Sequence, residues 1–265
     1  MKLQHWWLAH ATLLLLIVVF ACQPNVDLDS EPYDFPTFYP ELAISDDDPF
    51  SEKKAALGKQ LFFDKNLSID STIACSSCHL TDYAYSDTIA ISKGVHGRTG
   101  DRNSPSLIYS GFSPLINKDG GVVKLDIQAL IPIEDHNEMG IHILKLAERL
   151  NNDLDYAQSF LQAFNRKPDP YTIPRALAHF VRTLPSPSSP FDNYHAGELD
   201  SLSQEEINGM NLFMSDRLNC ISCHKDPLLR LLNLRIMDYT VNTKILEEHS
   251  SLRTVQTLVC LKYRV

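Results

Sequence analysis

The chain has 265 residues, and its 24 Lys and Arg against 33 Asp and Glu give a formal net charge of −9. This acidic balance excludes a basic nucleic-acid-binding surface as the leading interpretation, and it suits solubility or a basic protein partner. Of the six cysteines, five belong to the motifs described below. Only Cys260 is left over, so no disulfide framework is predicted.

The N-terminus has the pattern of a secretion signal. Lys2 precedes an apolar run over residues 8–21, which is too short for an ordinary transmembrane helix. The run ends in Val-Phe-Ala-Cys at residues 19–22, which resembles a bacterial lipobox. We therefore expect residues 1–21 to be a lipoprotein signal peptide and Cys22 to be the lipidated first residue of an exported, periplasm-facing, membrane-anchored protein. The alternatives are a simple signal peptide or an uncleaved anchor.

Helical patterns alternate with long irregular segments in the rest of the chain. Residues 22–50 are rich in Asp, Glu and Pro and predict a tether. Apolar spacing predicts helices from Glu52 to about residue 63 and at about 141–150, 154–165 and 172–184. Residues 66–126 predict loops, and 184–194, with three prolines, predict a connector. Ser203 and Glu206 form a capping box that opens a further helix.

Two Cys-x-x-Cys-His motifs are the strongest chemical signal. They occupy residues 75–79 and 220–224, and their chemistry-bearing side chains are Cys75, Cys78, His79, Cys220, Cys223 and His224. Two thiols at this spacing can add to the two vinyl groups of one porphyrin, and the His that follows can bind the iron. Zinc-binding arms or redox dithiols are the alternatives. Neither needs a His directly after the second Cys in both copies, so the motifs favour two c-type haems.

With these motifs, the chain resembles the bacterial di-haem cytochrome c peroxidase family, which includes MauG-like enzymes. The resemblance runs from about Leu57 to His224. It is carried in order by Leu-Gly-Lys-Gln-Leu-Phe-Phe-Asp at 57–64, the first haem motif, Ser-Lys-Gly-Val-His-Gly at 92–97 and Arg-Asn-Ser-Pro-Ser-Leu at 102–107, then Asp-Gly-Gly at 119–121, Gln128, Pro132, Glu-Met-Gly at 138–140, Arg-Thr-Leu at 182–184 and Ser-Pro-Phe-Asp at 189–192.

The resemblance implies roles for several residues. The haem on His79 would be the peroxidatic centre, and His96 matches the distal His that caps its iron at rest and leaves on activation. Gln128 and Glu138 match two polar residues that line the opened site, where Glu138 would move the proton that O–O cleavage needs. Asn103 matches a ligand of a calcium ion. The alternatives are an ordinary loop His at 96 and, at 138, a carboxylate that stabilises the start of the next helix.

The implied fold is mostly α, with two cytochrome c-like haem domains and long loops. The N-terminal peroxidatic domain would span residues 51–195, and the C-terminal electron-transfer domain residues 196–265. The second domain is expected to be incomplete, because the match fades after His224, where the family continues to a Met that caps the second haem. A second departure is Lys118, which stands where the family usually has a Trp between the haems.

The implied activity is reduction of hydrogen peroxide to water with electrons from a small cytochrome c or copper protein. A homodimer is compatible with the resemblance. Three alternatives stay open: MauG-like oxidation of a protein or organic substrate, a di-haem electron carrier, and an inactive fragment. A carrier has no use for Gln128 and Glu138, so these two residues favour a peroxidase.

Overall fold

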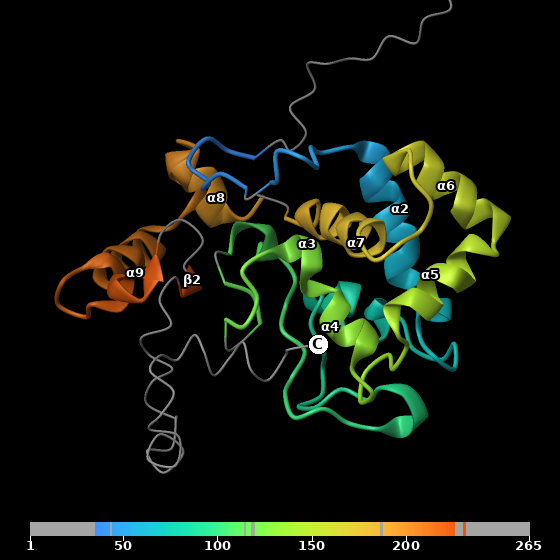
Figure 1. Cartoon of the computed structure of the whole chain (residues 1–265). Coiled ribbons are helices and arrows are strands. Elements are labelled where there is room, and N and C mark those ends of the chain that lie inside the picture. The colour runs from blue at the N-terminus through green and yellow to red at the C-terminus, as the bar shows by residue number, and fades with distance from the viewer. Residues whose placement is uncertain are drawn as a thin grey trace, which may run out of the picture. The chain divides into compact units, whose positions relative to one another are not determined.

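The structure is a computed structural model that describes residues 35–42, 44–113, 115–117, 120–185, 188–225 and 230–231, of which Lys225, Arg230 and Leu231 are described by backbone alone. The predictions for the signal peptide, Cys22, Lys118 and the C-terminal end lie outside these residues. The helices longer than one turn are α2 (Glu52–Phe63), α3 (Leu125–Gln128), α4 (Leu130–Glu134), α5 (Ile143–Asn151), α6 (Leu154–Phe164), α7 (Thr172–Arg182), α8 (Pro190–His195) and α9 (Gln204–Met214) (Figure 1). The predicted helices at 52–63, 141–150, 154–165, 172–184 and after Ser203 are therefore confirmed.

Helices α2 and α7 pack against each other and form the centre of the core (Figure 1). Gly58 makes this contact close, because a Cβ there would lie 1.8 Å from the carbonyl oxygen of Ala176. Leu61, Phe62, Ile173 and neighbouring apolar side chains are buried at the interface. Helices α5 and α6 extend this core with Leu146, Leu150 and Phe160, and burial of such side chains is the main force that holds the helices together.

Residues 64–124 contain little regular structure. The described part holds short 3₁₀ turns: η1 (Lys65–Leu67), η2 (Cys75–Ser77), η3 (Thr81–Tyr83), η4 (Val95–Gly97) and η5 (Ser110–Phe112). This confirms the predicted loops. The segment is tied back to the helices at its end, where Arg182 on α7 forms a buried ion pair of 2.9 Å with Asp126 on α3. A buried pair of this kind fixes the position of α3 because separating its charges is costly.

Residues 35–50 differ from the tether that the sequence predicted over 22–50. Their described part packs on the helices, and Asp48 is only 3% exposed. Lys54 donates to Asp48 Oδ1 across 2.6 Å, and Nε2 of the buried His179 lies 3.2 Å from Asp48 Oδ2. The composition hid this contact, because an Asp-rich segment becomes ordered where its carboxylates meet cationic groups of the folded body.

The predicted connector over 184–194 ends in a helix, α8 (Pro190–His195). Ser189 Oγ accepts from the Asp192 N–H across 3.1 Å, and the Asp192 carboxylate accepts from the Ser189 N–H across 3.0 Å. Pro at the first helical position and this capping box are helix-start signals that the proline content of the connector obscured. Tyr39 donates across 2.7 Å to the other Asp192 oxygen, so α8 is also held by residues 35–42.

Helix α9 leads into the second Cys-x-x-Cys-His motif. Its start is as predicted: Ser203 Oγ accepts from the Glu206 N–H, and the Glu206 carboxylate accepts from the Ser203 N–H. None of its residues is buried. The motif follows as η7 (Cys220–Ser222) and a two-stranded antiparallel ladder, β1 (His224–Lys225) with β2 (Arg230–Leu231). The mostly helical class is confirmed, while the division into two haem domains stays a prediction.

Within the described ranges, no helix has both the length and the apolar character that crossing a membrane requires.

Candidate functional site

The first Cys-x-x-Cys-His motif closes into a single turn. The N–H groups of Cys78 and His79 both donate to the Cys75 carbonyl, across 3.2 and 2.9 Å, and Ser77 Oγ accepts from the Ala74 N–H across 3.0 Å. Ala74 is buried and Cys75 packs at the edge of the hydrophobic core. The core therefore fixes the turn from one side, and both thiols stay on a partly buried surface.

The ring of His79 is oriented by a backbone carbonyl. Nδ1 lies 2.9 Å from the carbonyl oxygen of Tyr85. A carbonyl can only accept, so Nδ1 is the donor and Nε2 carries the lone pair in the neutral ring. Burial lowers the pKa of His79, and the nearby carbonyls of Tyr85 and Pro105 oppose this only in part. A neutral imidazole with Nε2 available is the form that binds iron.

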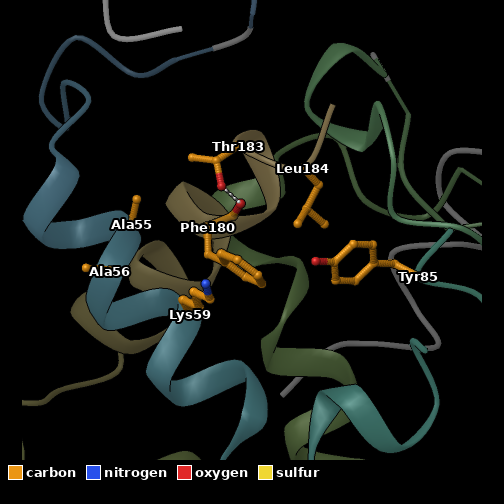
Figure 2. A pocket seen from close by; sticks show the side chains of 7 residues that line it. All are labelled: Ala55, Ala56, Lys59, Tyr85, Phe180, Thr183 and Leu184. Carbon is orange, nitrogen blue, oxygen red and sulfur yellow. Dashed lines mark hydrogen bonds between the residues drawn. The ribbon is translucent and has the colours of Figure 1, made fainter. Parts of the chain in front are cut away.

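Tyr85 connects this ligand to the helical core. Its ring packs against Phe62 and Phe180, with centroids 5.8 and 6.4 Å apart. Its hydroxyl points toward a pocket between α2 and the end of α7 (Figure 2). The volume of this pocket is about 380 Å³. The pocket is lined by Ala55, Ala56, Lys59, Tyr85, Phe180, Thr183 and Leu184. The α2–α7 pair thus holds the residue whose carbonyl orients His79.

A second part of the site is built on residues 137–140. The N–H of Val95 donates to the Glu138 carbonyl across 2.8 Å, and Val95 is fully buried. Gly94 is required at this contact, because a Cβ there would lie 2.0 Å from the Asn137 carbonyl oxygen. Gly140 has a φ of +65°, which glycine adopts without strain. The loop that carries His96 is therefore docked directly on the segment that carries Glu138.

The side chain of His96 is half exposed and meets a carboxylate. Its Nδ1 lies 3.3 Å from Asp70 Oδ2, and 53% of the side chain is accessible. The backbone at His96 is left-handed, with a φ of 56°, which is uncommon for a residue with a side chain. The turn over Val95–Gly97 thus projects His96 away from the buried Val95.

Glu138 lies near the haem-attachment thiols. Burial raises the pKa of the Cys75 thiol to about 12, and the charge of Glu138 adds to this effect. Burial likewise raises the pKa of Cys78, again with a contribution from Glu138. Desolvation, and secondly the charge of Asp135, raise the pKa of Glu138 itself. A carboxyl with a raised pKa holds and releases a proton closer to neutral pH.

The structure assigns the helix-start role to a different carboxylate. Glu134 Oε1 accepts from the N–H of Ile143, the first residue of α5, across 3.0 Å. This N–H is therefore satisfied by Glu134, while the alternative interpretation of Glu138 as a further stabiliser of this helix stays a prediction. The Glu138 N–H donates to the Asp135 carbonyl, and the Glu138 carbonyl accepts from the Val95 N–H. Both backbone groups therefore hold the turn in place, while the carboxylate takes no part in these bonds.

Gln128 ends α3 and donates from Nε2 to Asn117 Oδ1 across 3.1 Å. Its position is fixed by Asp126, two residues earlier, through the buried pair with Arg182. Both Gln128 and Glu138 are described, and no hydrogen bond joins their side chains. Their shared task in one site stays a prediction.

The expected calcium ligand is engaged in a different contact. Asn103 donates from Nδ2 to the Ile89 carbonyl across 2.8 Å, which leaves its Oδ1 as the atom that a cation could use. Among the described residues, no group of three or more His, Cys, Asp or Glu side chains is close enough to hold a metal ion. Calcium binding near Asn103 stays a prediction.

The second motif shares one backbone hydrogen bond with the first. The Cys223 N–H donates to the Cys220 carbonyl across 3.1 Å. His224 is exposed, and its ring centroid lies 5.8 Å from that of Phe213 on α9. The thiols, the following His and an adjacent aromatic ring suit a c-type haem, whose large apolar faces would supply the burial that α9 lacks.

Both motifs fit haem better than zinc. Two thiols at this spacing match the two attachment points of one porphyrin. His79 presents Nε2 from a fixed ring. A tetrahedral zinc site would need four ligands in one place, and the described residues show no such cluster.

A model of the family described as di-haem cytochrome c peroxidase matches residues 52–200. The chain belongs to this family. Methylamine utilization protein MauG of Methylophilus methylotrophus is 34% identical over 66% of this chain and 53% of its own length. Cytochrome c551 peroxidase of Nitrosomonas europaea is 34% identical over 68% of this chain and 53% of its own length. The chain thus spans about half the length of these curated relatives.

Solved structures support the same fold. A MauG-like protein associated with microbial copper homeostasis superposes with a TM-score of 0.70 at 33% identity, over 77% of this chain and 61% of that one. The diheme peroxidase BthA of Burkholderia thailandensis gives 0.59 at 25% identity, over 67% and 50%. Family membership makes c-type haem the implied cofactor and a peroxidase-type oxidoreductase the implied class of enzyme.

Sequence reasoning missed two contacts of the candidate site. It assigned no role to Asp70, which lies beside His96, or to Tyr85, whose carbonyl orients His79. Asp70 lies 26 positions before His96, and nothing in the spacing indicates that their loops meet. The carbonyl of Tyr85 carries no sequence signal at all, since every residue has one.

Proposed function

We propose that this protein reduces hydrogen peroxide to water at the haem attached through Cys75 and Cys78 and ligated by His79. The observation that carries the proposal is the position of Glu138. Its backbone carbonyl accepts from the N–H of Val95, next to His96, across 2.8 Å, and its charge contributes to the raised pKa of both attachment thiols. A proton-transferring group and a removable cap at one haem are what a peroxide site needs and an electron carrier does not.

The haem, when bound, supplies the redox chemistry and the Lewis-acidic iron. The chain supplies ligands, proton transfer and access. Glu138 would take the proton from one peroxide oxygen and deliver it to the other, which assists departure of water as the O–O bond breaks. Desolvation raises the pKa of Glu138, which supports this role, because a carboxyl in a dehydrated site holds a proton more readily than one in water.

His96 would cap the first haem at rest and leave before peroxide binds. The loop is anchored at Val95 and has left-handed residues at His96 and Gly97. Because Val95 stays bonded to Glu138 and the His96 ring next to it is half exposed, the ring can leave the iron without unfolding the segment that carries Glu138. Gln128, held by Asn117, would line the opened site and donate a hydrogen bond to the substrate.

Electrons would enter at the haem attached through Cys220 and Cys223, ligated by His224, from a small cytochrome c or copper protein. The net charge of −9 supports a basic donor, because opposite charge steers encounter. Export, attachment to the membrane through a lipid on Cys22, calcium near Asn103 and a homodimer complete the proposal. They rest on the sequence patterns and on the family.

A second candidate is oxidation of a protein or organic substrate. The observation in its favour is the similarity to relatives named MauG. Stoichiometry separates the two candidates. Turnover of peroxide with two equivalents of a small reduced redox protein supports the first. Peroxide consumption that requires an organic or protein substrate, with no oxidation of the redox protein, would favour the second.

A further inference from the structure

Asp70 and His96 come from two loops that dock on adjacent residues. The N–H of Ile69 donates to the Met139 carbonyl across 2.9 Å, and the N–H of Val95 donates to the Glu138 carbonyl across 2.8 Å. The two docking bonds bring Asp70 Oδ2 to 3.3 Å from His96 Nδ1. The approach is therefore a product of backbone pairing and not of two long side chains that happen to meet on the surface.

The two oxygens of Asp70 have separate partners. Oδ1 accepts from the N–H and the hydroxyl of Thr72, across 3.1 and 2.7 Å, and Ser68 Oγ lies 3.5 Å from it. Oδ2 faces His96. The carboxylate is thus held rigidly by its own loop while its second oxygen is presented to the ring. A pre-ordered acceptor loses little side-chain entropy when it binds.

The contact decides which nitrogen of His96 can bind a metal. An ionised carboxylate only accepts hydrogen bonds, so we expect a neutral His96 ring beside Asp70 to carry its proton on Nδ1 and the lone pair on Nε2. His79 is oriented in a related way, because its Nδ1 forms a hydrogen bond of 2.9 Å with the Tyr85 carbonyl, whereas His96 and Asp70 form an ion-pair contact of 3.3 Å. Metal-binding His residues usually donate their second N–H in this way, which fixes the ring and increases its basicity.

We propose that Asp70 is the positioning residue for His96: it holds the ring with Nε2 directed to the first haem and strengthens the cap in the resting protein. The proposal rests on the proposed function, in which His96 is the distal ligand of that haem. The competing interpretation is a solvent-exposed pair that contributes almost nothing, and it predicts no effect of Asp70 on the haem.

The test is Asp70→Asn in the haem-loaded full chain. Asn keeps an oxygen for Thr72 and places an NH₂ group, which cannot accept from Nδ1, toward His96. We expect the capped-to-open equilibrium of the first haem to shift about tenfold toward open, within the range usual for such outer partners. Two readouts measure it: a high-spin fraction in the ferric optical and EPR spectra before any reduction, and an apparent cyanide affinity that rises by the same factor because cyanide binds only the open state.

Two matched variants separate the carboxylate from general effects. Asp101→Asn removes the same charge from an exposed position five residues beyond His96. Ser71→Ala changes an exposed neighbour of Asp70 in the same loop and leaves the carboxylate and its bonds to Thr72 in place. Both should keep the wild-type spin state and cyanide affinity. A shift of similar size in either variant would overturn the proposal, because it would assign the effect to net charge or to loop integrity.

His96→Gly distinguishes failure of this proposal from failure of the proposed function. The cyanide-binding phase that His96→Gly strengthens belongs to the first haem. If His96→Gly is high-spin and Asp70→Asn behaves as wild type, His96 is the ligand and Asp70 has no part in holding it. If His96→Gly itself leaves the spectrum low-spin and cyanide binding unchanged, the ligand assignment fails and the role of Asp70 fails with it.

A second measurement needs no variant of Asp70, in case Asp70→Asn yields no haem-loaded protein. His96→Gly is titrated with imidazole, 4-methylimidazole and 1-methylimidazole as replacement ligands. An acceptor at Asp70 predicts that imidazole and 4-methylimidazole, which keep an N–H, bind about tenfold more tightly than 1-methylimidazole, which has lost it. Equal affinities for all three ligands would contradict the proposal.

Discussion

The backbone N–H of Val95 donates to the carbonyl of Glu138 across 2.8 Å. This bond joins the residue before the expected haem cap to the residue expected to move the proton. Gly94 on one side of the bond and Gly140 on the other permit the close approach of the two chains. His96, the expected cap, and Glu138, the expected proton-transferring residue, are therefore anchored at the same hydrogen bond. A change that disturbs this bond should affect both residues.

Gly94→Ala tests this shared fixed point. The added methyl would lie 2.0 Å from the Asn137 carbonyl oxygen and 2.6 Å from that of Glu138, so the two segments must separate. We expect a loss of about 1–3 kcal/mol in the free energy of unfolding, together with a larger open fraction at the first haem. Gly100→Ala is the control, because nothing lies within 4 Å of the added atom. Equal stability and equal cyanide affinity in the two variants would show that the contact is not needed.

The haem count tests the two attachment motifs. Wild-type protein should carry two haems per chain in a pyridine haemochrome assay and stain for haem after denaturing electrophoresis, since thioether bonds survive denaturation. Replacing Cys75 and Cys78 by Ser should remove one haem, and replacing Cys220 and Cys223 should remove the other. A wild-type count of one or zero would contradict the assignment.

The ion pair between Asp126 and Arg182 gives a test of how the chain positions Gln128. Both side chains are buried, so Arg182→Met leaves an uncompensated carboxylate and should cost about 3–5 kcal/mol in the free energy of unfolding. The exposed pair of Arg166 with Asp169 is the control, and Arg166→Met should cost less than about 1 kcal/mol. Chemical denaturation checks both values, and similar costs at the two sites would contradict the structural role.

Asp48 predicts a specific pH dependence of stability. Burial alone raises the pKa of this carboxyl, but His179 and Lys54 outweigh burial and bring it from 3.8 to about 2. The pKa of Asp48 is lower in the folded than in the unfolded protein, so its ionised carboxylate stabilises the fold fully above pH 3.8. This stabilisation is lost as the pH falls through about 2. It amounts to roughly 2 kcal/mol. Asp48→Asn should lack this part of the acid dependence, while Asp46→Asn, at an exposed position, should retain it in pH-dependent denaturation.

The positions of most helices could be predicted from the sequence because they depend on local patterns of apolar and capping residues. Apolar spacing gave α2, α5, α6 and α7 to within about two residues at most ends, and the capping box of Ser203 with Glu206 gave the start of α9. The helix α8 was missed although Ser189 and Asp192 form the same kind of box, because the prolines around it indicated a connector.

The contacts that join distant loops could not be predicted. The carboxylate of Asp70 meets His96, and Asp126 meets Arg182 across 56 positions, only because the segments between them fold back on a common core. Asp48 was assigned to a tether for the same reason: a carboxylate in a polar segment shows no preference for order until its cationic partners are in place. Family resemblance supplied the roles of His96, Gln128 and Glu138, which periodicity alone does not reveal.

Steady-state peroxide turnover by Glu138→Gln tests the central claim most directly. With an artificial electron donor and both haems retained, we expect turnover to fall by about 10²–10⁴-fold, because Gln cannot move the proton. Glu134→Gln is the matched control: it removes the charge of a nearby carboxylate while the Gln oxygen can still accept from the Ile143 N–H, so turnover should stay near that of the wild type. If the wild type turns over peroxide and Glu138→Gln does so at the same rate, Glu138 is not the proton-transferring group and the proposed peroxide site is wrong.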